Sequence, residues 1–440
     1  MTKISTEQHP SGYFNFMKHT TGIGVVLAFC LLSTALSVGA ANPGSFNVRD
    51  CGAKGDGKTK DTAALQKALD ACAAAGGGTV RVPAGVYLTG SLVVGANTTL
   101  RFEPRANLVG SPDIEDYPLV QVRWEGEFRE GHRALISAEK AANVTLDGAG
   151  AIFGPPLPVS RLRDPRGPLL IELTECTNAV LDGFFTQYQQ LWSIHLLFCQ
   201  NFTARNLTIR TLNANGDGID VDSCSGVTIE RCDINTGDDA ISLKSGRGQA
   251  AARLGRPTQN VTIRNCTLAS SIYAALGVGS ELSAGIRDVK IEDCILSGRQ
   301  NAIYLKSRDG RGGSIENLTG KNLIIGQSPT FIGIDLLKKG IQASDPVPGE
   351  AEKWTRLSRI SFNHIQVNDV AELVAGKNVP AEQPVDGLTL TDITGTCDQG
   401  ITLANMTNVK LAGIKVTGFH GPLVTVQNVK GRGLDGTAAR

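Results

Sequence analysis

The sequence predicts an all-β fold, a right-handed parallel β-helix that is closed at its N-terminal end by a capping helix. Three observations lead to this fold class. A short phrase of alternating apolar residues recurs along the chain, glycine is abundant at 51 residues, and aromatic residues are sparse at 5%. Recurring short strands with many glycines are typical of a solenoid, in which each repeat forms one coil of a continuous stack.

The recurring phrase reads Asn, Gly or Asp, then apolar, any residue, apolar, two polar residues, apolar, any residue, apolar. It is clearest from Asn201 to Ile209 and from Asn260 to Leu268. Each copy therefore predicts a strand, a polar corner and a second short strand. Further copies begin at Asn143, Asn178, Gly226, Asp288, Asn317, Arg359, Gly387 and Asn408.

Neighbouring copies mostly begin roughly 20–30 residues apart, which suits one coil of a solenoid. Leucine-rich repeats share this period but need a Leu-x-x-Leu-x-Leu pattern that the sequence lacks, and propeller blades need longer periods. The wider spacings that follow Gly226 and Asn317 predict coils with inserted loops. We expect the segments Gly246–Arg256 and Leu336–Trp354 to form the walls of a cleft.

One position of the phrase predicts a ladder of side chains inside the coils. It is occupied by Leu207, Cys232, Cys266, Cys294 and Leu323. Buried cysteine behaves as a small apolar residue, so these thiols are predicted to fill the interior rather than to form disulfides. No Cys-x-x-Cys pair occurs in the sequence, which argues against a structural metal site.

A helix is predicted over Thr59–Ala75, before the first coils. Its apolar residues fall on one face at helical spacing, and the glycine run that starts at Gly76 ends it. The end coil of a β-helix exposes its apolar interior, so an amphipathic cap is needed there. Cys51 and Cys72 are candidates for a disulfide within this cap.

Residues 1–40 are predicted to be a secretory signal peptide. Lys18 and His19 precede an apolar run from Gly22 to Leu36, and small residues follow at Val38–Ala40. The run is short for a membrane span. We therefore expect a secreted or periplasmic protein in which residues 41–440 form a single β-helix catalytic domain, monomeric and without a membrane partner once the signal is removed.

The charge balance excludes partners that are recruited by a strong overall field. Lys and Arg total 43 against 42 for Asp and Glu, a formal net charge of +1. We expect no nucleic-acid partner, and any preference for an anionic substrate must come from local basic residues.

The densest cluster of polar residues lies on two consecutive copies of the repeat, in the segments Asn215–Asp222 and Thr236–Lys244. Asp217 and Asp238 are about one short coil apart, and adjacent parallel strands lie about 4.8 Å apart, so the two carboxylates are predicted to be near neighbours on one outer face. Asp239 follows directly, and Gly237 is predicted to mark a bend that lets both aspartates reach the cleft.

Clustered carboxylates repel one another, which raises the pKa of at least one of them. Such a cluster supplies a protonated acid beside ionised bases, which is what cleavage of a glycosidic bond requires. Two other interpretations remain open at this point. Asp220 and Asp222 suit corner residues that satisfy turn backbone groups, and the acids could also form a calcium site.

Several motifs resemble those of one enzyme family. Asn215-x-Asp217-Gly-Ile-Asp, Gly237-Asp238-Asp239, Gly279-Ser-Glu281 and Lys306 followed by Gly310-Arg-Gly-Gly313 appear in the order of family 28 of the glycoside hydrolases, the polygalacturonases and their relatives. The resemblance spans about Phe46 to Gly313. It implies an inverting polygalacturonase that cleaves the α-1,4 bonds of galacturonan in pectic polysaccharide, without a cofactor or a metal ion.

By the same resemblance, Asp238 is the general acid, and Asp217 and Asp239 hold and deprotonate the attacking water. Inversion leads us to expect about 6.5–9.5 Å between acid and base. Lys306 matches the lysine that meets the substrate carboxylate, and Asn215 is assigned to substrate binding with it.

The sequence departs from the family at two positions. The usual Gly-His-Gly reads Tyr273-Ala274-Ala275, and the usual Arg-Ile-Lys reads Tyr304-Leu305-Lys306. Rhamnogalacturonan or another pectic chain is therefore an alternative substrate, and Tyr304 could stack on a less charged sugar ring.

Further residues on the same segments are candidates for the site. Lys244 and Arg308, together with Arg247 and Arg311, could contact an acidic polymer. Glu281 is expected to support the site by hydrogen bonding. His195, in the Trp192-Ser-Ile-His segment, is either a cleft residue or a satisfied core histidine.

Two other functions compete with hydrolysis. A pectate-lyase-type elimination on the same fold would need calcium and a basic residue, and no arginine base is evident beside the acids. A non-catalytic carbohydrate-binding β-helix would explain the missing His and Arg. Exo or endo action depends on whether loops block one end of the cleft.

Overall fold

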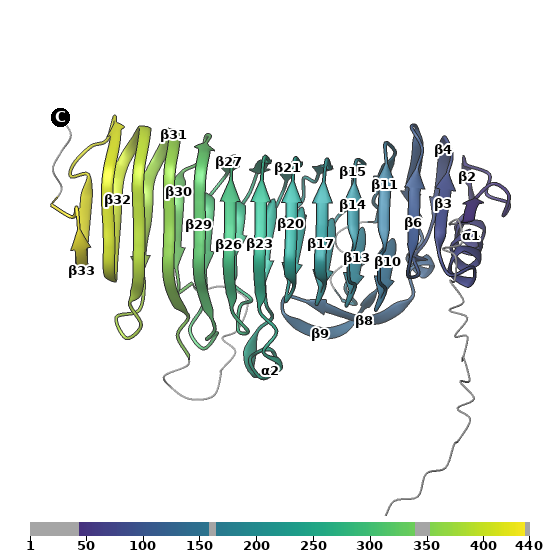
Figure 1. Cartoon of the computed structure of the whole chain (residues 1–440), viewed down its shortest axis with the longest axis horizontal. Coiled ribbons are helices and arrows are strands. Elements are labelled where there is room, and N and C mark those ends of the chain that lie inside the picture. The colour runs from purple at the N-terminus through teal and green to yellow at the C-terminus, as the bar shows by residue number, and fades with distance from the viewer. Residues whose placement is uncertain (1–43, 158–163, 339–352, 436–440) are drawn as a thin grey trace, which may run out of the picture. The chain divides into compact units, whose positions relative to one another are not determined.

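In a computed structural model of the chain, the structure describes residues 44–157, 164–338 and 353–435. These residues form a right-handed parallel β-helix (Figure 1), which confirms the predicted fold class. Each strand of the coils pairs in parallel with the strand one coil away, as β16 (Ile194–Leu197) does with β19 (Ile219–Asp222). None of the helices among these residues is long and apolar enough to cross a membrane. The predicted signal peptide lies outside the described residues.

Three faces run along the coils. Face 1 consists of β5 (Leu92–Val93), β10 (Ile136–Glu139), β13 (Ile171–Thr174), β16, β19, β22 (Ile241–Lys244), β25 (Ala274–Val278), β28 (Asn301–Lys306) and β30 (Thr330–Asp335). Face 2 begins with β1 (Gly44–Asn47), β3 (Gly78–Val82), β6 (Thr98–Phe102), β11 (Thr145–Gly148), β14 (Val180–Asp182), β17 (Gln200–Arg205), β20 (Ser225–Glu230), β23 (Thr258–Arg264) and β26 (Ile286–Glu292).

Face 3 contains β2 (Asp56–Lys60), β4 (Gly85–Thr89), β7 (Ala106–Gly110), β12 (Ala151–Phe153), β15 (Phe185–Gln187), β18 (Thr208–Arg210), β21 (Asp233–Thr236), β24 (Thr267–Ser270) and β27 (Ile295–Gly298). Towards the C-terminus, long strands continue around the corners between faces. These are β29 (Ser314–Ile325), β31 (Arg356–Asn378), β32 (Val385–Thr417) and β33 (Val424–Arg432).

The corners explain the first residue of the repeat phrase. All ten predicted repeat starts have a left-handed backbone, with φ between 54° and 84°. Asn, Asp and Gly tolerate this conformation best, which is why they recur at the position. The asparagines also bond to one another across coils, since Asn178 donates to Asn143 at 3.2 Å and Asn143 donates to Asn97 at 2.8 Å.

The predicted internal ladder is confirmed. Leu207, Cys232, Cys266, Cys294 and Leu323 are each no more than 2% exposed. All nine cysteines in the described part of the chain are free thiols, so the predicted disulfide between the first two of them, Cys51 and Cys72, is wrong. The physical reason is direction, because Cys72 points from the capping helix into the core while Cys51 lies nearer the surface.

The capping helix α1 covers Thr62–Ala74 and buries Leu65, Ala68, Leu69 and Cys72. It begins later than predicted because Asp56–Lys60 already form a strand, β2. The left-handed backbone of Gly76, with φ 83°, turns the chain away after its end.

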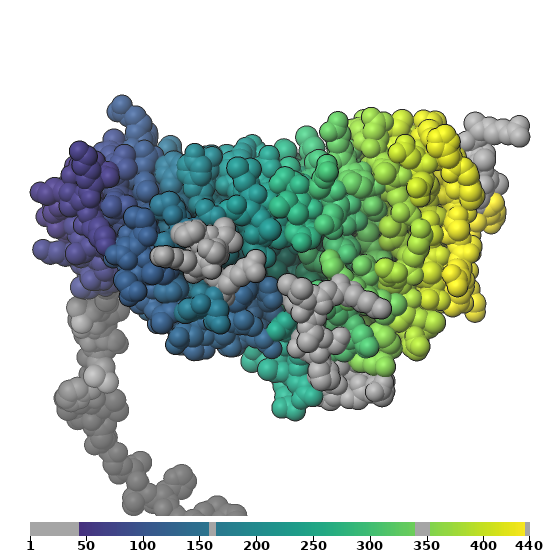
Figure 2. Space-filling view, turned by 180° about the vertical axis from the view of Figure 1, so that it is seen from behind, coloured from purple at the N-terminus to yellow at the C-terminus, as the bar shows by residue number. Residues whose placement is uncertain are grey.

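Two insertions lie beside face 1. An antiparallel hairpin, β8 (Leu119–Trp124) and β9 (Glu127–His132), is inserted between β7 and β10, after the short 3-10 helix η1 (Ile114–Asp116). The hairpin runs along one side of the coils, and α2 (Gly248–Leu254) projects on the same side (Figure 1), as Figure 2 also shows. The predicted loop Gly246–Arg256 contains α2, whereas most of Leu336–Trp354 lies outside the described residues. The hairpin was not predicted.

Candidate active site

The strand register sets Asp217, Asp238 and Asp239 beside one another. Ile219 in β19 pairs with Ile241 in β22, and the Gly218 N–H donates to the Asp239 carbonyl at 3.0 Å. Asp217 and Asp239 therefore occupy equivalent positions on adjacent coils. One carboxylate oxygen from each of the three aspartates lies within 4.8 Å of the others. The expected neighbourhood of Asp217 and Asp238 is confirmed, although the register partner of Asp217 is Asp239.

A bend at Gly237 and Asp238 turns the Asp238 side chain into the site, as predicted. A Cβ on Gly237 would lie 2.2 Å from the carbonyl oxygen of Asn213 on the previous coil. Only glycine allows this close approach. The Gly-Asp-Asp motif thus combines a residue required by the backbone with two carboxylates.

The three carboxylates have different hydrogen-bond partners. Asp238 accepts from the backbone N–H groups of Asn215 and Asp239, both at 2.9 Å. Asp239 accepts from the Ala274 N–H at 3.2 Å and from Lys306 Nζ at 2.7 Å. The buried Oδ1 of Asp217 has no hydrogen-bond partner among the described residues. Ala274 therefore contributes its backbone N–H to the site.

Burial and mutual repulsion raise the affinity of the cluster for a proton. Burial is the largest cause that raises the pKa of Asp217 well above its usual value, and the charges of Asp220 and Asp238 add to it. Burial and the charge of Asp239 raise the pKa of Asp238, while the Lys306 ammonium opposes the shift. Interacting groups of this kind titrate together. Asp217 and Asp238 therefore hold a proton at a pH where an ordinary aspartate is ionised.

The carboxylates are closer than we expected for an inverting enzyme. The expected separation was about 6.5–9.5 Å, whereas oxygens of the three groups come within 4.8 Å of one another. The reason is that Asp238 directly precedes Asp239 in the chain, and that the register places Asp239 beside Asp217 on the neighbouring coil, at a strand spacing of about 4.8 Å. Two hydrogen bonds of about 2.8 Å to one water span roughly 4.5 Å at a tetrahedral angle, so a single water bridges such a pair.

The trio opens into a pocket of about 150 Å³. Of the residues predicted from sequence, Asn215, Lys244, Glu281, Lys306 and Arg308 line it together with the trio. The remaining lining residues were not predicted to belong to the site, and they are Glu125, Trp192, Tyr273, Ser280 and Lys338. A larger cavity of about 650 Å³ lies between the hairpin and α2 and contains none of the three aspartates.

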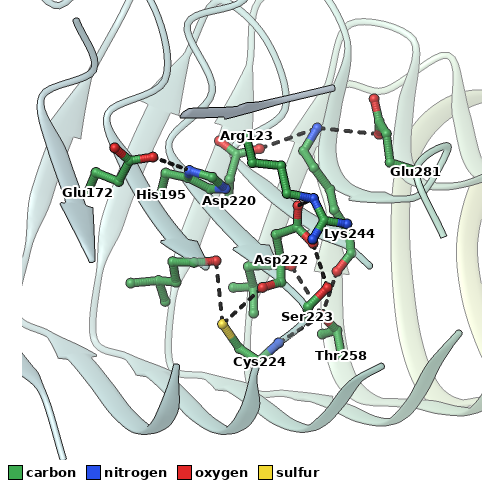
Figure 3. Close-up of polar contacts among 12 residues, drawn as sticks. Arg123, Glu172, His195, Asp220, Asp222, Ser223, Cys224, Lys244, Thr258 and Glu281 are labelled. Carbon is green, nitrogen blue, oxygen red and sulfur yellow. Dashed lines mark hydrogen bonds and ion pairs between the residues drawn. The ribbon is translucent and has the colours of Figure 1, made fainter. Parts of the chain in front are cut away.

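Figure 3 shows a buried row of charges formed by Asp220, Lys244 and Glu281. Lys244 and Glu281 line the same pocket as the trio. Lys244 Nζ is 3.3 Å from Asp220 and 3.6 Å from Glu281, and all three side chains are less than a tenth exposed. Although burial alone would lower it, the charges of Glu281 and Asp220 raise the pKa of Lys244 well above its usual value. Burial raises the pKa of Asp220 to about 7. Lys244 is thus a buried cation, held between acids at the base of the pocket.

Asp220 and Asp222 are not corner residues, which corrects that interpretation. Both belong to strand β19, and they are 0% and 1% exposed. Asp222 pairs with Arg123 of the hairpin, whose Nε is 3.2 Å from the carboxylate (Figure 3). The alternation of the strand directs both aspartates outward, where other elements cover them.

His195 and Tyr304 do not line the pocket. His195 is 0% exposed, and its Nδ1 is 3.0 Å from Glu172 Oε1 (Figure 3). Its buried Nε2 has no hydrogen-bond partner among the described residues, so only one of the two ring nitrogens is satisfied. Tyr304 donates to Asp335 at 3.2 Å, and Lys338 Nζ lies 4.8 Å from the centre of its ring. The tyrosine that does line the pocket is Tyr273.

Two of the four basic residues weighed as polymer contacts lie away from the pocket. Arg311 is 0% exposed and donates to the Ser280 carbonyl at 2.9 Å. Arg247 forms an ion pair with Glu127 of the hairpin. Arg308 and Lys244 are the two that line the pocket.

The chain resembles known proteins over most of the coils. The family model described as glycosyl hydrolases family 28 matches residues 72–346. A probable polygalacturonase from Vitis vinifera is 32% identical over 291 residues, which make up 62% of this chain and 59% of that protein. The chain therefore spans less than two thirds of the length of this curated relative.

Two solved structures share the fold. An exopolygalacturonase from Thermotoga maritima superposes with a TM-score of 0.71 at 24% identity, over 88% of this chain and 92% of that one. A family 28 exopolygalacturonase from Yersinia enterocolitica gives a TM-score of 0.79 at 21% identity, over 89% and 78%. At these identities the likeness concerns the right-handed parallel β-helix itself.

Proposed function

Because the chain belongs to family 28 of the glycosyl hydrolases, we propose that it is a polygalacturonase that hydrolyses the α-1,4 bonds of galacturonan. The observation that carries the proposal is the trio of carboxylates in a pocket that also contains Lys306 and Arg308. A protonated acid beside ionised bases suits glycosidic cleavage, and the cations suit a uronic acid.

In the proposed reaction, Asp238 donates its proton to the glycosidic oxygen. The raised pKa of Asp238 keeps it protonated above the usual range of an aspartate. Its two backbone hydrogen bonds hold the side chain at the bend, so the proton is presented in one direction. Protonation of the leaving oxygen is worth roughly 10²–10⁴-fold in rate.

Asp239 and Asp217 hold the attacking water between two coils. Asp239 forms an ion pair with Lys306 at 2.7 Å, and we assign to it the role of the carboxylate that accepts the proton of the water. The free Oδ1 of Asp217 offers the second acceptor for the water. Attack from this side, opposite to the leaving oxygen, would invert the anomeric carbon.

Lys306, Arg308 and Lys338 give the pocket a positive rim for the carboxylate of the substrate. Tyr273 presents an aromatic ring in the same pocket, which favours a second candidate, another pectic chain such as rhamnogalacturonan. Asn215 and Glu281 are proposed to orient the sugar hydroxyls. We further propose a monomeric protein that is secreted or periplasmic.

A substrate panel tests this function. Polygalacturonate, rhamnogalacturonan and a neutral polymer would be incubated with the wild type, with Asp238→Asn and with Asp233→Asn, a matched control on exposed face 3. We expect reducing ends from polygalacturonate, a loss of about 10²–10⁴-fold in Asp238→Asn, and wild-type rates in the control. Activity should persist in a chelator without unsaturated products. Equal activity of Asp238→Asn and the control would refute the mechanism.

A further inference from the structure

We propose that the enzyme acts from a chain end, because the β8–β9 hairpin walls off the N-terminal end of the pocket and Glu125 at its tip binds the terminal sugar. The inference rests on the proposed hydrolysis of a pectic chain. It assigns to Glu125 a role in selecting chain ends and to the hairpin a role in excluding internal segments.

The hairpin is held firmly against the coils near the trio. Arg123 in β8 pairs with Asp222 of β19, both with side chains only 2% exposed. Glu127 in β9 pairs with Arg247, which follows β22, and the Arg247 N–H donates to the Gly126 carbonyl at 3.4 Å. The hairpin therefore crosses the coils on the N-terminal side and ends level with the pocket.

The hairpin covers an outward side chain of face 1. On face 3, strand β21 has exposed and buried residues in alternation, with Asp233 and Asn235 exposed. On face 1, every residue of β16, β19, β22 and β25 is buried, although alternate side chains of a strand point outward. On β19 the covering element is the hairpin, because its Arg123 lies against the outward Asp222. The hairpin therefore fills the space over β19 in which a polymer would lie in an open groove.

A stack of side chains closes the wall across face 1. The Arg166 guanidinium lies 4.3 Å from the ring centre of Trp124 in the hairpin and 5.4 Å from that of Trp192. On its other side, Arg166 Nη1 is 3.4 Å from the Asn215 side-chain oxygen at the pocket rim. Arg166 is 3% exposed, so the stack fills the space between the hairpin and the pocket rim at this point.

Glu125 has a left-handed backbone conformation that is unusual for glutamate. It is the first residue of a two-residue loop between β8 and β9, with φ 51°, and Gly126 follows with φ 85°. Such loops strongly favour Asn, Asp or Gly at the first position. A residue kept in a sparsely populated conformation is a reason to look for function. Its side chain lines the acid pocket.

The chemistry of Glu125 fits the end of a chain. A carboxylate accepts hydrogen bonds from the hydroxyl groups of a terminal sugar. It repels the carboxylate of a further galacturonate, so it disfavours a chain that continues past this point. The hairpin and the charge of Glu125 therefore both favour binding of a chain end over binding of an internal segment.

Analysis of the products tests whether the enzyme acts from a chain end. Hexagalacturonate would be supplied unmodified, reduced to the alditol at its reducing end, or with an unsaturated sugar at its non-reducing end. We expect a product of one size from the first time point, and a loss of about tenfold or more when one of the two ends is modified. Products of all sizes at once, with neither modification slowing release, would overturn the inference. No hydrolysis of any form would instead refute the proposed function.

Kinetics of Glu125→Gln test the specific residue, with Glu130→Gln on the exposed part of β9 as the matched control. Loss of hydrogen bonds to one charged group should raise KM about tenfold while kcat changes less than about twofold. The control should match the wild type. An unchanged KM in Glu125→Gln would remove Glu125 from the proposal, and circular dichroism of both variants would exclude misfolding as the cause of a change.

Discussion

Asp217 is a carboxylate in surroundings that disfavour its charge, because it is buried and faces other acids. The residues of the trio were predictable from the Asn-x-Asp and Gly-Asp-Asp motifs at one-coil spacing. The register partner of Asp217 was not, because the strand register pairs Asp217 with Asp239 and not with Asp238. Nor were Glu125 and Arg166, which belong to no repeat or motif and reach the site only through the fold.

Asp217→Asn should lower the activity of the enzyme and raise its stability. The folded protein holds the proton of Asp217 more tightly than the unfolded chain does, so its ionisation costs stability as the pH rises above the usual aspartate pKa of 3.8. We expect the substitution to lower kcat by about 10²–10⁴-fold and to raise the Tm at pH 7 more than at pH 4. Calorimetry at both pH values measures this. A lower Tm at pH 7 would contradict the electrostatic account.

Lys306→Met should move the pH profile of kcat upward. The Lys306 cation favours the ionised form of Asp238, so its removal raises the pKa of Asp238 further and keeps the acid protonated to higher pH. The basic limb of the profile should shift to higher pH. The KM for uronides should rise, because a cation that binds their carboxylate is lost. Lys290→Met, on an exposed position of β26, is the control. A shift to lower pH would argue against Asp238 as the acid.

At the scale of elements, the coil strands were predictable and the hairpin was not. The strands of faces 2 and 3 carry the repeat phrase. In contrast, β8 and β9 occur once and make their contacts far along the chain, as between Glu127 and Arg247, 120 residues apart. A local signal existed in two alternating segments around Glu125-Gly126, but Glu is disfavoured in that turn. The outward charges of β19 were misread as corner residues for the same reason, because the covering hairpin was unknown.

The buried Lys244 provides a test of this covered face. Lys244→Met would leave Asp220 and Glu281 without their shared cation in a buried site. Breaking such a pair costs about 3–5 kcal/mol of unfolding free energy, whereas Lys321→Met at an exposed position of β29 should stay within about 0.5 kcal/mol. Urea unfolding of the three proteins measures the difference. Equal stabilities would show that the row of charges is solvated.

For the whole molecule, the solenoid could be predicted from the sequence because each coil needs the same residue types at the same positions. A left-handed corner selects Asn, Asp or Gly, and inward positions select apolar residues or cysteine. Insertions between copies carry no such periodicity, and they shape the pocket. This is why the fold class was predicted and the closure of the site was not.

A thiol titration checks the interior of the coils. Of the nine cysteines described, only Cys51 is not buried. We expect about one fast-reacting thiol in the native protein and nine from these positions after denaturation without reductant. If Cys51 and Cys72 were joined, the denatured count would fall by two, and the arrangement of the N-terminal cap given above would be wrong.

The central claim is that the trio hydrolyses galacturonan with inversion, and the anomeric form of the first product tests it most directly. Proton NMR during the first minutes of polygalacturonate cleavage would record the new reducing end before it equilibrates. Cleavage of an α-linked chain by the proposed mechanism predicts the β-anomer first, with saturated sugars only. An α-anomer would contradict the assigned roles of Asp217, Asp238 and Asp239, and an unsaturated product would contradict hydrolysis itself.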